Sequence, residues 1–273
     1  MKPVSLPMAL AVHGALLIAA VVALYPVAWV LAMAVSVGPV TGVVPWPTEP
    51  TWTHLAGLAR GDVAAALVTS IVVATSAALA GLAFSVTAAW ALARFDFPGR
   101  DLTLAGFVAT QTFPGVVMAV PLYLMLDALG LLDRLLGLVL VYAATSIPFS
   151  VWTLKGWFDG LPKDLEEAAM LDGAGRFRTF FSVLLPLLRP ALAVTGVFCF
   201  LNAWNEYVLA ATLLSDPRAF TLPVVLQRSV GDYGADWGAF AAGSIVASLP
   251  VIVLFFALQK HFIGGLTAGA VKG

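Results

Sequence analysis

The sequence predicts an all-α integral membrane protein whose chain crosses the membrane six times as helices. Apolar residues make up 61% of the 273 residues and charged residues only 11%, whereas soluble domains carry about 25% charged residues. The mean hydropathy is +0.97. Long uncharged stretches also separate the charged residues, and about 20 apolar residues are enough for a helix to cross the hydrocarbon core.

The charge and the cysteine content exclude several classes of function. The formal net charge is -1, so the chain lacks the surplus of lysine and arginine that binds nucleic acid. Cys199 is the only cysteine, which excludes an internal disulfide and a cysteine-based zinc site. The histidines are scattered, and there is no phosphate loop of the form G-x-x-x-x-G-K-[ST]. We therefore expect no catalytic residue, no metal site and no cofactor bound by this chain, which is not itself an enzyme.

The uncharged stretches place the predicted spans in order. The stretch between Lys2 and Glu49 predicts a first span followed by an external loop rich in proline and tryptophan. This apolar run is longer than that of a typical signal peptide, so we expect a retained helix. Shorter stretches predict the other spans, and we expect a single transmembrane domain over residues 1–273. The predicted spans are residues 8–35, 63–93, 102–126, 135–155, 187–214 and 238–260.

The distribution of lysine and arginine predicts the orientation. With a cytoplasmic amino terminus, the inner segments hold ten of these residues and the outer loops hold four. The positive-inside rule then places both termini in the cytoplasm of a multi-pass protein in the cell (inner, cytoplasmic) membrane. Pro114, Pro121 and Pro148 lie inside predicted spans. They indicate either ordinary kinks or hinges that line a pathway.

The inner loop at residues 161–186, called here the coupling segment, predicts a short projecting helix. Asp164 can cap this helix, its acidic first turn suits the positive end of the helix dipole, and Gly173 with Gly175 ends it. One face carries Leu165, Ala168, Ala169 and Asp172. A second turn follows, with Phe177, Phe180, Phe181 and Leu184 expected on one side and Arg176 and Arg178 on the other. Physical chemistry alone leaves open a helix pair lying on lipid headgroups.

A spaced motif in the coupling segment resembles the signature of the membrane subunits of binding-protein-dependent ABC importers. It consists of Glu167-Ala168-Ala169, Gly173 after three residues, Val183 after nine more, and Leu185-Pro186 after one more. The family more often has isoleucine at the position of Val183. The resemblance implies the type I ABC importer permease (MetI-like) fold, with a coupling helix that docks into a cleft of an ATP-hydrolysing subunit. The implied coupling residues are Glu166, Glu167, Ala168, Ala169, Met170, Asp172 and Gly173.

Three more stretches resemble the carbohydrate branch of this family, specifically its smaller maltose-type membrane subunit. They are residues 111–124, 203–207 and 265–273. The resemblance covers most of the chain and implies a permease subunit of an ATP-driven importer of a maltose-, trehalose- or oligosaccharide-type sugar. The implied partners are a second homologous permease subunit, two ATPase subunits that hold ATP and Mg, an extracytoplasmic sugar-binding protein, the sugar and the lipid bilayer. No nucleic acid is expected.

The resemblance also assigns two candidate contact regions, each with an alternative. The tail would contact the ATPase pair through Gly265, Leu266, Thr267 and Gly269, or it is a frayed terminus. The outer loop from Ser215 to Trp237 would dock the binding protein, or it caps the ends of the spans.

Glu206 is the one charged residue inside a predicted span. Placing a carboxylate inside the hydrocarbon core of the membrane costs a free energy on the order of 3 kcal/mol, unless it is protonated or has a partner. Asn202, Asn205 and Glu206 have the spacing of one polar helical stripe. Three roles stay open for this stripe: bonds between helices, lining of a sugar pathway, and proton coupling. Proton coupling would make the protein a secondary transporter that uses Glu206, and a membrane scaffold without transport is a further alternative.

Overall fold

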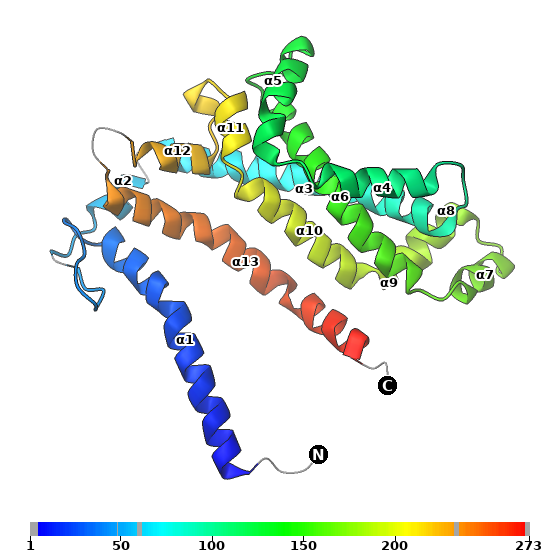
Figure 1. The fold of residues 1–273 in the computed structure, drawn as a ribbon, viewed down its shortest axis with the longest axis horizontal. Coiled ribbons are helices and arrows are strands. Elements are labelled where there is room, and N and C mark those ends of the chain that lie inside the picture. The colour runs from blue at the N-terminus through cyan, green and yellow to red at the C-terminus, as the bar shows by residue number, and fades with distance from the viewer. Residues whose placement is uncertain (1–4, 48, 59–61, 232–234, 271–273) are drawn as a thin grey trace. The chain divides into compact units, whose positions relative to one another are not determined.

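The computed structural model describes residues 5–47, 49–58, 62–231 and 235–270, and for residues 261–270 it describes the backbone alone. Helices are the regular elements of these residues, apart from an isolated bridge between Ser36 and Pro50 (Figure 1). Long apolar runs form helices because only bonds within the segment satisfy the backbone where water is absent. The chain divides into two compact units, Met1–Ala65 with Val225–Leu249, and Ala66–Val224 with Pro250–Gly273.

The first unit contains α1 (Leu6–Ala34), α2 (Thr53–Leu58) and the beginning of α13 (Trp237–Ala270). Its small core centres on Ala34, Ala241 and Ala242. Within α1, Ala32 and Ala34 are the buried residues, although the helix is almost wholly apolar. The rest of its surface is therefore available to lipid or to another protein.

The second unit is built on α3 (Asp62–Arg94), α6 (Leu135–Asp159) and α10 (Arg189–Trp204), of which α6 and α10 pack side by side (Figure 1). Small residues allow close approach between membrane helices. A side-chain carbon added at Gly81 of α3 would lie 2.5 Å from the hydroxyl of Ser146 in α6. The buried core includes Val86, Ala89, Leu92, Val151, Leu154, Phe158, Phe180, Leu184, Leu188 and Ala191.

The predicted third span is bent. Helix α4 (Arg100–Thr110) is followed by the 3-10 turn η1 (Gly115–Met118) and α5 (Ala119–Ala128), and the two parts meet at 101°. Pro114 stands at the bend. A helix cannot continue through this position, because the proline ring clashes with the preceding turn. Pro148, in contrast, lies inside the continuous helix α6. One of these two prolines therefore marks a sharp turn and the other does not.

The connection from α6 to α10 consists of short helices. They are α7 (Asp164–Leu171), α8 (Arg176–Thr179), the π-helix η2 (Phe180–Leu184) and α9 (Leu185–Leu187). The stretch Arg176–Leu187 meets α10 at 79°. Pro186 and Pro190 lack the N–H groups that an unbroken helix would need here. The two prolines account for the wider π turn and for the bend.

The chain after α10 does not continue as the single helix expected through Glu206. Helix α10 ends at Trp204, and α11 (Val208–Leu213) begins after a short break. The turn η3 (Pro217–Ala219) and helix α12 (Leu222–Arg228) follow. The expectation of one continuous polar stripe on a helix was therefore wrong, because Glu206 lies in the break between two helices.

Among the described residues, four helices are long and apolar enough to cross a membrane, or six if each bent pair is one span. The four are α1, α3, α6 and the part of α13 up to Lys260. They contain most of the predicted spans 8–35, 63–93, 135–155 and 238–260. The predicted span 102–126 falls on the first bent pair. The predicted span 187–214 begins at the bend of the second pair, covers α10 and extends past the end of that pair into α11. The membrane boundaries themselves stay predictions.

Candidate functional site

Helix α7 of the coupling segment begins one residue earlier than a cap at Asp164 would allow. Lys163 occupies the cap position, already has helical backbone angles, and makes no capping bond with its side chain. The turn starts at Pro162, whose carbonyl accepts from the N–H of Leu165. The predicted cap was therefore wrong. Asp164, Glu166 and Glu167 instead form an acidic first turn. The positive end of the helix dipole stabilises negative charges at this place.

Gly173 ends α7, as the sequence predicts. Its φ of 82° is left-handed, a conformation that costs glycine little. The N–H of Gly173 donates to the carbonyl of Met170 at 3.0 Å, and that of Ala174 donates to the carbonyl of Ala169 at 2.9 Å. These two bonds form a Schellman motif, which satisfies carbonyls at the helix end. The short helix is consequently well defined at its C-terminal end.

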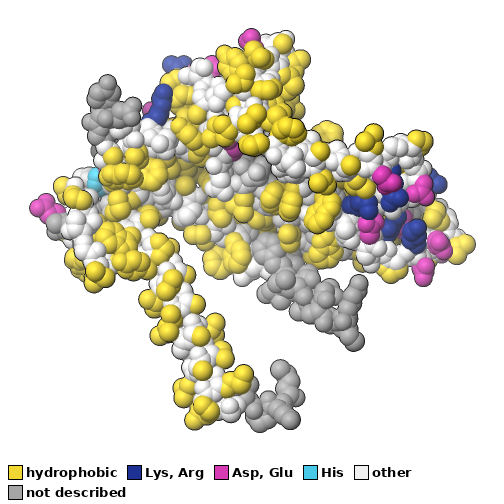
Figure 2. All heavy atoms as spheres, in the orientation of Figure 1, with side chains coloured by type: hydrophobic (Ala, Val, Ile, Leu, Met, Phe, Trp, Pro, Cys, Tyr) yellow, Lys and Arg dark blue, Asp and Glu magenta, His cyan; other side chains and the backbone are white. Residues whose placement is uncertain are grey.

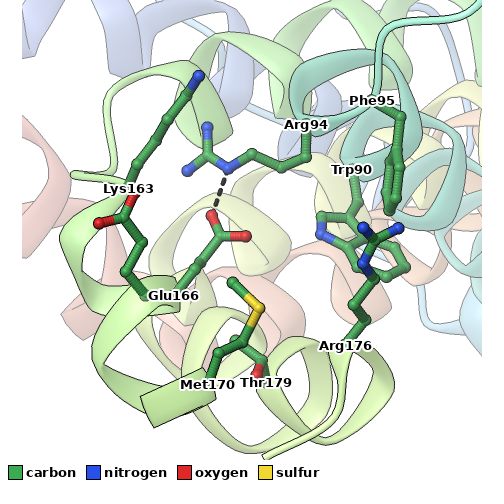
Figure 3. Close-up of a pocket in the computed structure, with 9 residues that line it drawn as sticks. Trp90, Arg94, Phe95, Lys163, Glu166, Met170, Arg176 and Thr179 are labelled. Carbon is green, nitrogen blue, oxygen red and sulfur yellow. Dashed lines mark hydrogen bonds and ion pairs between the residues drawn. The ribbon is translucent and has the colours of Figure 1, made fainter.

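Glu166 points inward and pairs with the last residue of α3. The guanidinium of Arg94 donates through Nε to the Glu166 carboxylate (Figure 3). Its Nη2 donates to the carbonyl of Leu161 at 3.0 Å. The Arg94 and Glu166 side chains are 7% and 15% exposed. Both charges are largely removed from water, so each needs the other as the partner that offsets its loss of hydration.

A hollow of about 190 Å³ lies at this ion pair. Its walls come from α3, α7 and α8, and the side chains around it are drawn in Figure 3. Lys163 and Glu167 contribute charge at its rim, and Met170 contributes an apolar wall. Acidic and basic side chains gather over α7 and α8 (Figure 2).

The second half of the segment packs on the ring of Trp90 in α3. The ring centroids of Trp90 and Phe180 are 4.6 Å apart, and those of Trp90 and Phe177 are 6.2 Å apart. Phe180 and Leu184 are buried, whereas Phe177 and Phe181 are exposed. The single apolar face expected for these four residues is therefore split into a buried row and an exposed row.

The other predicted coupling residues of α7 face outward or are partly covered. Glu167, Ala168, Met170, Asp172 and Gly173 are exposed, and Ala169 is partly buried. Leu171 beside them is 89% exposed. The segment thus presents small and apolar side chains to its surroundings, together with the carboxylates of Glu167 and Asp172.

Glu206 forms a second polar cluster, at the break between α10 and α11. Its carboxylate accepts from the N–H groups of Leu209 at 2.9 Å and Ala210 at 3.1 Å. The hydroxyl of Tyr142 in α6 donates to it at 2.9 Å. The carboxylate therefore satisfies N–H groups in the first turn of α11, which have no partner within the helix, and it links α11 to α6.

The two asparagines predicted beside Glu206 lie close to it along an open hollow of about 510 Å³. Asn202 donates to the hydroxyl of Thr145 at 3.4 Å, and Asn205 donates to the carbonyl of Leu201 at 3.0 Å. Phe198 and Tyr207 also line this hollow. Amide groups and aromatic faces thus meet on one surface of the second unit.

Residues 81–267, which contain both clusters, match the model of a protein family described as the binding-protein-dependent transport system inner membrane component. The chain belongs to this family. Members are integral membrane permease components of ABC importers and are not themselves enzymes.

Relatives of this permease are named as carbohydrate transport proteins. The diacetylchitobiose uptake system permease protein DasC of Streptomyces coelicolor is 36% identical, over 91% of this chain and 92% of that protein. The trehalose transport system permease protein SugB of Mycobacterium tuberculosis is 34% identical, over 92% and 93%. The maltodextrin transport system permease protein MdxG of Bacillus subtilis is 38% identical, over 75% and 74%. These relatives confirm the predicted resemblance to maltose-type carbohydrate importer permeases.

A solved structure confirms the predicted fold of this permease. It is the crystal structure of a bacterial ABC transporter involved in the import of the acidic polysaccharide alginate. The match has a TM-score of 0.80 at 24% sequence identity and covers 96% of this permease and 100% of the matched chain. The overall fold of this permease is therefore that of the matched chain.

The sequence alone did not single out Arg94, Trp90 or Tyr142. Arg94 was counted only among the inner charges, although an arginine at the end of a span next to an acidic helix could have suggested an ion pair. Tyr142 places a hydroxyl group inside an apolar span. A carboxylate in the membrane, such as that of Glu206, needs a hydrogen-bond donor of this kind. The tail residues Gly265, Leu266, Thr267 and Gly269 lie in the last turns of α13, and their side chains are outside the described part of the structure.

Proposed function

We propose that this permease is one of two homologous membrane subunits of an ATP-driven importer of an oligosaccharide or a related carbohydrate. The observation that carries the proposal is the coupling segment, a short helix held by α3 with an exposed face of small residues, in a chain of this family. A helix that enters a groove on a partner needs a slim contact face. Ala168 and Gly173 are exposed on α7 and just after it.

The carbohydrate class rests on the relatives. The names of DasC, SugB and MdxG specify diacetylchitobiose, trehalose and maltodextrin. These compounds share hydroxyl-rich rings, which proteins bind with hydrogen bonds and aromatic faces. The hollow lined by Asn202, Asn205, Phe198 and Tyr207 offers both, and we propose that it borders the sugar pathway. Glu206 would then position α11 beside that pathway.

The mechanism follows from two orientations of the pathway. A binding protein loaded with sugar docks on the outer loops. Two separate ATPase subunits bind ATP with Mg and then move toward each other. The exposed coupling residues transmit this movement to the spans, and the tail residues add a contact with the two ATPase subunits. Differential binding of ATP and of the binding protein to the two orientations drives the cycle. Both termini and the coupling segment lie on the cytoplasmic side of the cell membrane in this proposal.

Substituting the exposed face of α7 tests this function. Ala168→Trp should prevent docking, so ATPase subunits should no longer co-purify. Uptake of a labelled panel of trehalose, maltose and diacetylchitobiose should fall at least about tenfold, the equivalent of about 1.4 kcal/mol of lost docking free energy. Ala128→Trp changes an exposed alanine at the end of α5 and serves as the matched control. A wild-type permease that binds no ATPase, or an Ala168→Trp variant that behaves like the control, contradicts the proposal.

A further inference from the structure

We propose that Arg94 is a positioning residue that ties the coupling segment to α3, so that α7 and α3 move together during the transport cycle. The inference rests on the proposed function, because it assumes that a partner moves α7. The coupling segment is followed directly in the chain by α10. Through Arg94, a movement of α7 would also reach α3, which is not adjacent to the coupling segment in the chain.

The contacts of Arg94 join distant parts of the chain at two points. Its partner Glu166 lies 72 residues further along, in the first turn of α7. Its second acceptor, the carbonyl of Leu161, lies 67 residues further along, just before that helix. One guanidinium therefore holds both the entry to α7 and its first turn. Such a fork requires arginine, because lysine has no second donor at a fixed angle.

Burial distinguishes this pair from the nearby surface ion pairs. Lys155–Asp159 and Arg100–Asp96 each join residues four apart in the chain, and their carboxylates are 45% and 98% exposed. Exposed pairs of that kind contribute little. At 7% and 15% exposure, Arg94 and Glu166 would each be left as an uncompensated buried charge if they separated. Separation is therefore strongly opposed, which is the property of a tie.

Aromatic contacts also connect the second half of the coupling segment to the end of α3. Trp90 lies one helical turn before Arg94 and contacts the ring of Phe180. The guanidinium of Arg176 lies 5.3 Å from the centre of the Phe95 ring. The end of α3 thus contacts α7 through charge, and α8 with η2 through rings. A shift of the segment relative to α3 would have to break both sets of contacts.

Helix α3 is suited to carry movement over a long distance. Its 33 residues contain no proline, and at 1.5 Å per residue it is about 50 Å long. In its first half the buried hydroxyl of Ser70 accepts from the N–H of Leu222 at 2.7 Å. Leu222 belongs to the loop region predicted to dock the binding protein. Arg94 therefore lies at one end of a continuous helix whose other half contacts that region.

Distance measurements on the assembled transporter test the tie. Spin labels at Asp164→Cys in α7 and Thr87→Cys in α3 occupy exposed positions, whereas the native Cys199 is buried. The distance between the labels is measured by pulsed electron paramagnetic resonance, without nucleotide and with ATP and vanadate. In the wild type we expect a change within the about 1–2 Å of small helix shifts. In Arg94→Met we expect a larger change or a clearly broader distribution.

Four further variants make the result decisive. Glu166→Gln keeps the shape of the side chain, so it remains usable where Arg94→Met does not assemble, and we expect it to lose the tie. The double variant should match the single ones, because both remove the same link, and Arg94→Lys should be intermediate. Asp159→Asn breaks the exposed pair and should behave like the wild type. A merely structural role would lower the yield of complex and leave the distance unchanged.

The outcomes separate this inference from the proposed function. A wild-type permease without an ATPase partner contradicts the proposed function itself. A wild-type complex that contains the ATPase but whose label distance changes by much more than about 2 Å overturns the tie, since packed elements shift by less. Variants at Arg94 and Glu166 that keep the wild-type distances in both nucleotide states also overturn it.

Discussion

Asp133 joins two loops outside the predicted spans through its own short side chain. Its carboxylate accepts from the N–H groups of Ser215 at 2.8 Å and Asp216 at 3.0 Å. Its own N–H donates to the carbonyl of Leu213 at 3.0 Å. Its φ of 57° is left-handed, a region in which Asp and Asn are enriched. The bonds from the two N–H groups lower the pKa of Asp133 from its ordinary value of 3.8.

This lowered pKa predicts a pH-dependent effect of Asp133→Asn. The folded pKa lies below the unfolded one, so the carboxylate stabilises the fold above about pH 4 and loses this effect as the pH falls through the folded pKa. Asn keeps the backbone conformation but carries no charge. The variant should therefore unfold at a lower temperature than the wild type at pH 7, with a smaller difference at pH 3.

Thermal unfolding of the purified permease at both pH values measures this difference. Asp127→Asn, at an exposed position on α5, should show no comparable pH dependence. An equal difference between wild type and Asp133→Asn at the two pH values would refute the prediction.

At the scale of elements, the packing of α3 against α6 depends on a missing side chain. The Cβ of an alanine at Gly81 would meet the Ser146 hydroxyl at 2.5 Å and the Ala143 carbonyl at 3.4 Å. The first distance is too short for two unbonded heavy atoms, so either the Ser146 hydroxyl would have to turn away from the Ala143 carbonyl, to which it donates, or the helices would have to separate. Close approach of this kind is a main source of association between membrane helices.

We predict that Gly81→Ala destabilises the permease by about 1–3 kcal/mol, the usual range for an overpacked core. Gly156→Ala in α6 is the matched control, because nothing lies within 4 Å of its added carbon. Alanine is the better helix former, so the control should be neutral or more stable by up to about 1 kcal/mol. Adding Ser146→Ala to Gly81→Ala should restore part of the loss. Equal unfolding midpoints for the two glycine variants would show that the helices are not in close contact at Gly81.

At the scale of the whole molecule, the environment of Glu206 bears on the choice between two kinds of transporter. A proton-coupled carrier needs a carboxylate that can release and rebind a proton during each cycle. Glu206 instead accepts from two backbone N–H groups and from Tyr142. These contacts favour a role in holding α11 against α6, and they do not favour the proton-coupled alternative.

We therefore predict that Glu206→Gln in the assembled importer retains assembly and an uptake rate close to that of the wild type. Uptake should also persist when a protonophore collapses the pH gradient while ATP is supplied in proteoliposomes. Glu206→Ala removes the acceptor altogether, so it should destabilise the fold by about 1–3 kcal/mol. Lost uptake in a fully assembled Glu206→Gln complex would assign the carboxylate to transport instead.

Much of the architecture was predictable from the sequence because it depends on local properties. The apolar stretches marked the helices, and the motif around Gly173 marked the end of α7, since a left-handed residue is needed there. Proline marked the candidates for bends but not their outcome, because Pro114 sits at a 101° turn and Pro148 lies inside α6. The break after Trp204 was missed, since nothing in the spacing of Asn202, Asn205 and Glu206 requires the helix to end.

By itself, the sequence determined that this chain is a membrane protein of importer-permease type, with a projecting segment between two spans. Hydrophobic length, charge spacing and a spaced motif are properties of the chain order, so they need no knowledge of packing. Only the tertiary structure decided that Arg94 holds Glu166 and that Tyr142 meets Glu206. Those partners are 72 and 64 residues apart in the chain. Their pairing depends on how the helices pack, because a buried charge selects the complementary group that packing brings within reach.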